Sequence, residues 1–194
     1  RLMGMDFNRI QFTPDVVPSD VTGFTMYDKQ SGQFLYRPGA VMCNLLLADE
    51  INRTSSKTQS ALLEVMEEGR VTVDGETHTV PAPFVVIATE NPVGSSGTQL
   101  LPESQLDRFM ISVSMGYPDH QSLVELLRDR QKVNPLENAK TVLTREEVLN
   151  LQKKVQEVYV ADAVLDYIAK LAEATREHEL IRLGVSPRGA LAIV

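Results

Sequence analysis

Over residues 1–117, short apolar runs alternate with polar turns and with one stripe of helix-spaced apolar positions. Short apolar segments with turn-rich borders are typical of strands, and a helix pattern between two of them indicates a parallel pair. We therefore predict an α/β fold with a largely parallel sheet covered by helices. The predicted strands are residues 7–12, 45–48, 84–88 and 110–115.

A helix is predicted after the second of these strands. Ser56 and Gln59 have the spacing of a capping box, and Leu62 and Val65 then fall on one helical face. Gly69 is the expected end of the helix. We expect the apolar face to pack on the sheet.

Two β-hairpins are predicted next to these elements. Residues 71–80 place β-rich arms around Asp74-Gly75, a strong signal for a two-residue turn. Residues 24–27 and 33–36 flank a polar tip and indicate a hairpin with a longer loop.

From residue 118 onward the apolar positions recur with helical spacing and predict four helices. We expect an α/β core over residues 1–117 and an all-α unit over residues 118–194, with the last helix unfinished at Val194. The helix signals are a stripe at 123–127, a capping box at Thr144 and Glu147, a stripe at 164–172, and the N-cap Ser186 before Pro187.

Composition and charge narrow the function classes. The 194 residues are 43% hydrophobic and 23% charged, as is ordinary for a globular protein. The net charge of -7 argues against broad attraction to nucleic acid, so a nucleic-acid partner is a weak second choice. The apolar runs fall short of the roughly 18 residues that a membrane helix needs, and no signal peptide is evident, so we expect a cytoplasmic protein without a membrane partner.

The acids Asp49 and Glu50 at the end of the second strand are the first candidates for chemistry. Ligands of parallel sheets collect outside the carboxyl ends of strands. There, Asp49 could anchor Mg²⁺ through water while Glu50 polarises an attacking water. The alternative is a strand that simply emerges into solvent.

Asn91 follows the third predicted strand, so its amide is expected beside the two acids. An amide can both donate and accept hydrogen bonds, as is needed to hold a water between Glu50 and a phosphate. The alternative is a turn residue before Pro92.

Three arginines are further candidates. Arg108 either makes a surface ion pair with Glu103 or Asp107, or it reaches a phosphoryl group in a neighbouring subunit. Arg188 lies in the first turn of its helix, where a cation is unfavourable and invites an anionic partner, unless Glu177 or Glu179 compensates its charge. Arg53 is either a surface residue or directed to a phosphate, and the sequence does not rank these two.

Taken in order, these segments resemble the MoxR group of AAA+ ATPases over essentially the whole chain. The matching segments are IQFTPDVVPSDVTG (10–23), LLLADEINR (45–53), KTQSALLEVMEEG (57–69), VTVDGE (71–76), VIATENP (86–92), LPESQLDRF (101–109), GYP (116–118) and LGVSPR (183–188).

The resemblance implies a role for each candidate residue. Asp49 is similar to the Walker B aspartate that holds Mg²⁺, and Glu50 to the catalytic glutamate. Asn91 is similar to the sensor 1 residue, Arg108 to the arginine finger acting on an adjacent subunit, and Arg188 to the sensor 2 arginine of a helical lid, whether it acts within or between subunits. Asp49, Glu50, Asn91 and Arg188 are thereby implied to bind ATP with its Mg²⁺.

The resemblance also implies an assembly and a cellular task. It implies a hexameric ring of this protein with chaperone-like work on client complexes, including metal cofactor insertion, with hairpins that face the pore or the client. The alternatives are a non-hydrolysing interaction scaffold and a nucleic-acid motor. Metal chelation is the weakest alternative because Cys43 and the three histidines form no ligand cluster in the sequence.

One departure from the family pattern is clear: GxxxxGK[ST] does not occur in these 194 residues. The family places its first strand and P-loop before the segments found here, with that strand between the ones predicted at 84–88 and 110–115. We therefore expect a segment of a longer ATPase with two unpaired sheet edges, a truncated lid and no appreciable ATPase activity on its own.

Overall fold

The computed structural model describes residues 2–91, 100–130 and 140–194, and its centre is a three-stranded parallel sheet. The strand order is β1-β4-β7, so β4 lies in the middle. In its register, Leu47 of β4 pairs with Arg9 on one side and Ile87 on the other. The strands are β1 (Phe7–Gln11), β4 (Leu45–Asp49) and β7 (Val85–Ala88). The predicted α/β fold with a parallel sheet is confirmed.

The predicted strand at residues 110–115 is wrong. This segment has no strand conformation, and Met110 and Met115 at its ends are 79% and 95% exposed. A strand needs a neighbour that takes its backbone hydrogen bonds, and in the described part of the chain no strand pairs with this segment. Its apolar pattern alone therefore did not determine its conformation.

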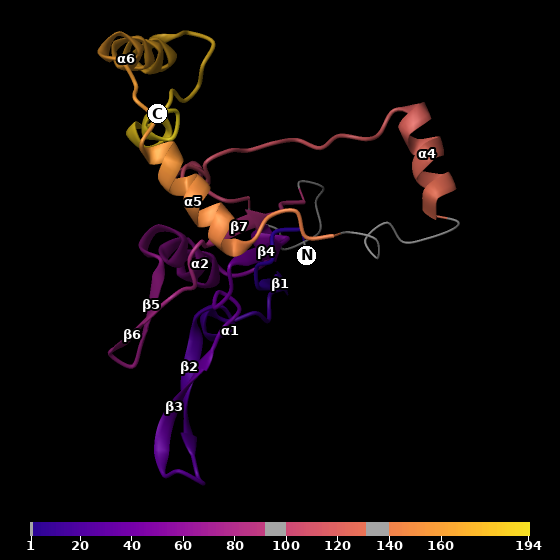
Figure 1. The fold of residues 1–194 in the computed structure, drawn as a ribbon, viewed down its shortest axis with the longest axis vertical. Helices are drawn as coiled ribbons and strands as arrows, with labels where there is room; N and C mark the ends of the chain where they lie inside the picture. The colour runs from indigo at the N-terminus through magenta and orange to yellow at the C-terminus, as the bar shows by residue number, and fades with distance from the viewer. Residues whose placement is uncertain (1, 92–99, 131–139) are drawn as a thin grey trace.

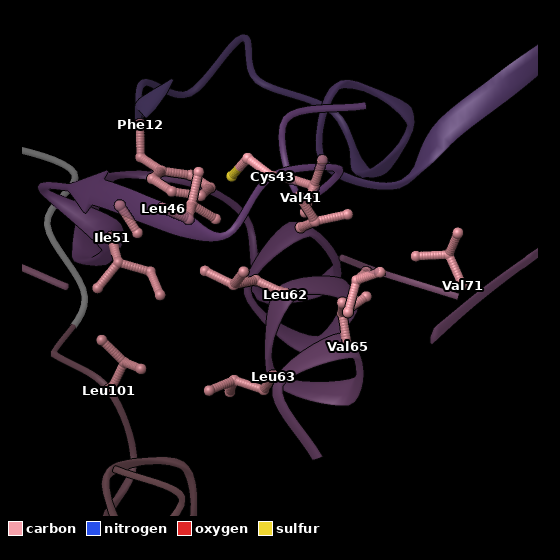
Figure 2. Close-up of a cluster of buried hydrophobic side chains, with 13 residues drawn as sticks. Phe12, Val41, Cys43, Leu46, Ile51, Leu62, Leu63, Val65, Val71 and Leu101 are labelled. Carbon is pink, nitrogen blue, oxygen red and sulfur yellow. The ribbon is translucent and has the colours of Figure 1, made fainter. Parts of the chain in front are cut away.

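Helix α2 (Ser56–Glu68) covers the sheet and supplies much of the core. Leu62, Leu63 and Val65 are at most 2% exposed. Figure 2 shows Leu62 on the side of Leu46 and Ile51, Leu63 on the side of Leu101, and Val65 on the side of Val71. Burial of each such side chain stabilises the fold by roughly 1.5–3 kcal/mol. The N-terminal capping box predicted at Ser56 and Gln59 is wrong.

The N-cap of α2 is Ser55, whose hydroxyl accepts a hydrogen bond from the Thr58 N–H at 3.3 Å. Gln59 is buried and donates instead to the Ile51 carbonyl at 3.1 Å, so its amide is not free to cap the helix. The helix ends at Gly69, whose φ of +64° is the left-handed conformation expected of a C-terminal glycine.

Both predicted hairpins are present, and Figure 1 shows them on the same side of the sheet. Asp74 and Gly75 both have positive φ, as a two-residue type I′ turn requires. The Tyr36 and His78 rings stack between the hairpins, with centroids 3.8 Å apart, and the Tyr36 hydroxyl donates to the Thr22 carbonyl at 2.6 Å. The hairpins are β2 (Gly23–Asp28) with β3 (Gln33–Pro38), and β5 (Arg70–Val73) with β6 (Glu76–Thr79).

Three short helices complete the first part of the chain. They are α1 (Pro18–Thr22), the 3-10 helix η1 (Ile51–Arg53) and α3 (Glu103–Leu106). The first two were not predicted. Helix η1 follows β4 directly and therefore fixes the path of the chain just beyond the two acids.

The four predicted C-terminal helices are all present. Thr144 and Glu147 form the expected capping box, and Ser186 caps the last helix by accepting from the Gly189 N–H at 2.9 Å. Figure 1 shows α5 and α6 on the side of the sheet opposite the hairpins. The helices are α4 (His120–Arg130), α5 (Arg145–Gln156), α6 (Asp162–Glu177) and α7 (Pro187–Leu191).

The described helices include none with the length and apolar character that crossing a bilayer demands. Cys43 is a buried free cysteine that packs in the core, as a lone thiol would.

Candidate functional site

Asp49, the last residue of β4, lies between the two other strands. Its Oδ2 contacts Nη2 of Arg9 from β1 at 2.6 Å, and its Oδ1 accepts a hydrogen bond from the Thr89 hydroxyl, just past β7, at 2.6 Å. The Thr89 hydrogen bond, followed by that of Arg9, lowers the pKa of Asp49 below the ordinary 3.8. The carboxylate is therefore ionised at neutral pH and is 24% exposed as a side chain.

Glu50 has a left-handed backbone, with φ 54° and ψ 48°. Non-glycine residues rarely adopt this conformation, which persists only where the surroundings hold it. Here the Glu50 N–H donates to Oγ1 of Thr89 at 2.9 Å, and the next N–H, of Ile51, donates to the Thr89 carbonyl at 3.0 Å. Thr89 thus orients both acids.

The Glu50 carboxylate is surrounded by donors. Oε2 accepts from Nη1 of Arg53 at 2.8 Å and from Nε2 of Gln11 at 2.9 Å. The Arg53 hydrogen bond is the main cause that lowers the pKa of Glu50 below 4.5, and a hydrogen bond from the Asn91 side chain lowers it further. Arg53 was expected either as a surface residue or as one directed to a phosphate. In the structure its guanidinium contacts the Glu50 carboxylate.

Asn91 is fixed by Asn52 of η1. The Asn52 side chain donates to the Asn91 carbonyl at 3.1 Å and accepts from the Asn91 N–H at 3.3 Å. Asn52 is 1% exposed, so its side-chain amide is shielded from water while Asn91 lies at the surface. Asp49, Glu50 and Asn91, which the sequence placed at two separate strand ends, are therefore brought to one edge of the sheet.

Sequence reasoning missed Arg9, Gln11, Thr89 and Asn52. Arg9 and Gln11 alternate along β1, and the register places Gln11 opposite Asp49. Polar residues at a period of two on an otherwise strand-like segment are a signal that could have found them. Asn52 and Thr89 carried no such pattern.

Arg108 and Arg188 meet in a second cluster around Glu67 of α2. Nη1 of Arg108 lies 2.6 Å from Oε2 of Glu67, and Nη2 of Arg188 lies 2.7 Å from Oε1. Nη1 of Arg188 is also 3.5 Å from Oδ2 of Asp107, whose Oδ1 accepts from the Ser186 hydroxyl at 2.6 Å. Glu67 was not expected from the sequence, where it looked like any acid on a solvated helix face.

The alternative ion pairs proposed for the arginines differ from those found. The carboxylate beside Arg108 is Glu67, and the acids beside Arg188 are Glu67 and Asp107. Glu103 pairs with Arg182.

The side-chain oxygen atoms at this edge of the sheet are of the kind that binds Mg²⁺. Among described residues no group of three or more His, Cys, Asp and Glu side chains could hold a metal ion by itself. Mg²⁺ needs no such group, because it keeps several waters and takes one or two carboxylates together with phosphate oxygens. Asp49 and Glu50, with the Thr89 hydroxyl between them, are oxygen donors of this kind.

Comparison with known proteins gives concordant results. The model of the ATPase family associated with various cellular activities (AAA) matches residues 1–111. The uncharacterized protein YeaC of Bacillus subtilis is 51% identical over 192 residues, which are 99% of this chain and 60% of YeaC. The chaperone MoxR1 of Mycobacterium tuberculosis is 41% identical over 203 residues, which cover 100% of this chain and 53% of MoxR1.

A solved structure shares the fold. The crystal structure of a Cytophaga hutchinsonii protein described as an ATPase superposes with a TM-score of 0.88 at 39% identity, over 99% of this chain and 61% of that one. The chain thus spans 53% to 61% of the length of these three proteins. Since the family model covers more than half of its 194 residues, the chain belongs to the AAA family of ATPases and is of the MoxR type.

Proposed function

We propose that the full-length protein hydrolyses ATP with Mg²⁺ in a hexameric ring and uses the energy to remodel, assemble or activate client protein complexes. The observation that carries this proposal is the joining of Asp49, Glu50 and Asn91 at one edge of the parallel sheet. Both acids have lowered pKa values, and the Asn91 side chain bonds to Glu50.

Each residue of this edge has a proposed part in the reaction. Asp49, as the Walker B aspartate, holds the ion through water, and bound Mg²⁺ supplies charge neutralisation at the phosphate oxygens. Glu50 takes the proton of an attacking water, which its ionised state at neutral pH allows. Asn91, as sensor 1, orients that water against the phosphate.

We propose that the two arginines of the second cluster also act in this reaction. Arg108 acts as the arginine finger on the nucleotide of the adjoining subunit, and Arg188 acts as the sensor 2 arginine of a helical lid over residues 118–194. Guanidinium groups suit this task because they are always charged and bind phosphate oxygens bidentately. Their partial exposure, 33% for the Arg108 side chain and 46% for that of Arg188, leaves donors accessible.

The assembly and its clients are part of the same proposal. A finger that acts between subunits requires a neighbouring copy of the chain, which a ring supplies, and the hairpins β2–β3 and β5–β6 offer surfaces for a client. Metal cofactor insertion into such a client is one form of this work. We place the protein in the cytoplasm, without a membrane or nucleic-acid partner, in keeping with its net charge of -7.

The test of hydrolysis is Glu50→Gln in the complete protein. We expect ATP binding to remain and turnover to fall by about 10² to 10⁴, the range of a lost general base. Glu76→Gln on the exposed β6 strand removes one carboxylate far from the site and is the matched control. Unchanged turnover in Glu50→Gln, with the control also unchanged, would exclude Glu50 as the base.

A second measurement addresses the 194 residues alone. We propose that they have no appreciable ATPase activity, because their sequence contains no GxxxxGK[ST] loop to supply backbone and lysine contacts to the phosphates. Mg²⁺-dependent turnover by the purified segment, abolished by Glu50→Gln, would contradict this proposal.

A further inference from the structure

The Glu67 carboxylate joins two arginines that are far apart in the sequence. Its Oε2 binds Arg108, which follows α3, and its Oε1 binds Arg188 in α7. Each oxygen thus serves a different guanidinium, at 2.6 Å and 2.7 Å respectively. No other described carboxylate is paired with both of these arginines.

Two further contacts hold this arrangement in place. Nη1 of Arg108 also donates to the Leu63 carbonyl at 3.4 Å, one turn before Glu67 on the same helix. Ser186, the N-cap of α7, donates to Asp107, the residue next to Arg108. These contacts hold both guanidiniums against α2 and close to each other.

Charge explains why a carboxylate is needed at this place. Two guanidiniums brought to one carboxylate repel each other, and the anion between them offsets that repulsion. Each guanidinium carries five N–H donors, of which Glu67 uses one on each side. Arg108 gives a further donor to the Leu63 carbonyl, and Nη1 of Arg188 faces Asp107. The donors that are left, on side chains 33% and 46% exposed, can reach a second anion.

We propose that Glu67 is a positioning residue that holds Arg108 and Arg188 together as one paired cation for a nucleotide phosphate. This inference rests on the proposed ATPase function. It adds that the finger and the lid arginine act as a unit, and that the unit is assembled by a side chain that touches neither nucleotide nor water in the reaction.

The test uses steady-state kinetics of the full-length protein with the variant Glu67→Gln. A glutamine keeps the shape but has one acceptor oxygen and an amide nitrogen that faces a guanidinium donor, so one arm of the bridge is lost. Because misplacement of a catalytic group by about 1 Å costs about 10²-fold, we expect kcat to fall by about that factor while the KM for ATP changes less than threefold. Glu68→Gln, at the adjacent residue whose partner is Arg70, is the matched control and should keep wild-type kcat.

Double variants separate positioning from a general loss of stability. In an Arg108→Ala or Arg188→Ala background, Glu67→Gln should lower kcat by less than about twofold more, because the group that it positions is already gone. A double variant whose kcat falls by the product of the two single-variant effects would overturn the proposal. So would an unchanged or raised kcat in Glu67→Gln, the latter because it would show that the carboxylate competes with the phosphate.

The bridge can also be measured without turnover. Urea unfolding of Glu67→Gln, Arg188→Ala and the double variant should give non-additive changes in midpoint, and additive changes would overturn the bridge itself. If the unsubstituted protein hydrolyses no ATP, the proposed function fails whatever the unfolding cycle gives. If it hydrolyses ATP and Glu67→Gln matches the control, only the present inference fails.

Discussion

Asn52 and Asn91 exchange two hydrogen bonds across the ends of β4 and β7, with donor–acceptor distances of 3.1 Å and 3.3 Å. The Asn52 side chain supplies the acceptor and the donor, and the Asn91 backbone supplies their partners. The buried amide therefore sets where the Asn91 side chain begins, and with it the group that bonds to Glu50.

Replacement of Asn52 by alanine should affect both stability and turnover. The variant removes both hydrogen bonds of the Asn52 amide to the Asn91 backbone, each of which contributes about 0.5–1.5 kcal/mol to the free energy of unfolding. ATP turnover of the full-length protein should fall because Asn91 is no longer held. Chemical denaturation and steady-state kinetics measure the two effects, and Asn150→Ala on the exposed face of α5 should change neither.

Two adjacent serines test the start of α2. Ser55→Ala removes the hydroxyl that accepts from the Thr58 N–H and should lower the free energy of unfolding by about 1 kcal/mol. Ser56→Ala, at the first helical residue, should stay within about 0.5 kcal/mol of the unsubstituted protein. Equal effects of the two substitutions in urea denaturation would contradict the assignment of Ser55 as N-cap.

The hydrogen bond from Thr89 to Asp49 should be visible as a pH dependence of stability. The folded pKa of Asp49 is lowered, so its contribution is present above the ordinary pKa of 3.8 and is lost as pH falls through the lower folded pKa. Thr89→Val removes the main cause of this shift. The stability difference between the unsubstituted protein and Thr89→Val should therefore be constant near neutral pH and shrink below pH 3.8.

The measurement is urea denaturation at a series of pH values. Thr72→Val provides the control, since the Thr72 hydroxyl bonds to that of Thr77 rather than to a carboxylate. Its effect on stability should not vary with pH. A Thr89→Val difference that is equally independent of pH would argue against the bond to Asp49.

Arg108→Ala tests action between subunits. The loss of an arginine finger lowers turnover by about 10³ or more. Mixed with Glu50→Gln subunits, it should regain part of the activity, because some interfaces then pair an intact Glu50 with an intact Arg108. ATPase assays over a range of mixing ratios measure this recovery, and Arg128→Ala on the exposed face of α4 is the control. Activity that stays at the level of the two separate variants at every mixing ratio would count against the trans assignment.

Local signals in the sequence were sufficient for most elements of the fold. The Asp74-Gly75 turn, the Thr144 cap and the Ser186-Pro187 start each depend on residues within a few positions, and each is confirmed. Residues 110–115 have the apolar content of a strand, but strand formation depends on a partner elsewhere, which local pattern does not contain. The Ser55 and Ser56 hydroxyls fit a cap equally well by type, so sequence could not distinguish them.

At the sheet edge, the sequence predicted those site residues that directly follow a strand-like run. Asp49, Glu50 and Asn91 were found because each follows a strand-like run, and parallel strands bring such ends together. Thr89 bonds to Asp49, 40 residues away, and Glu67 bonds to Arg108 and Arg188, 41 and 121 residues away. Nothing near Thr89 or Glu67 in the sequence specifies those contacts. The division into a core and a lid at residue 117 and the roles of the arginines stay predictions.

The stacking of Tyr36 on His78 has a mechanical consequence for the two hairpins. The Tyr36 ring contacts the β5–β6 hairpin while its hydroxyl is bonded to Thr22 at the end of α1, and β5 continues directly from α2. A load applied to either hairpin is therefore shared by both helices. The stack thus couples the two hairpins to each other as well as to the helices that carry them.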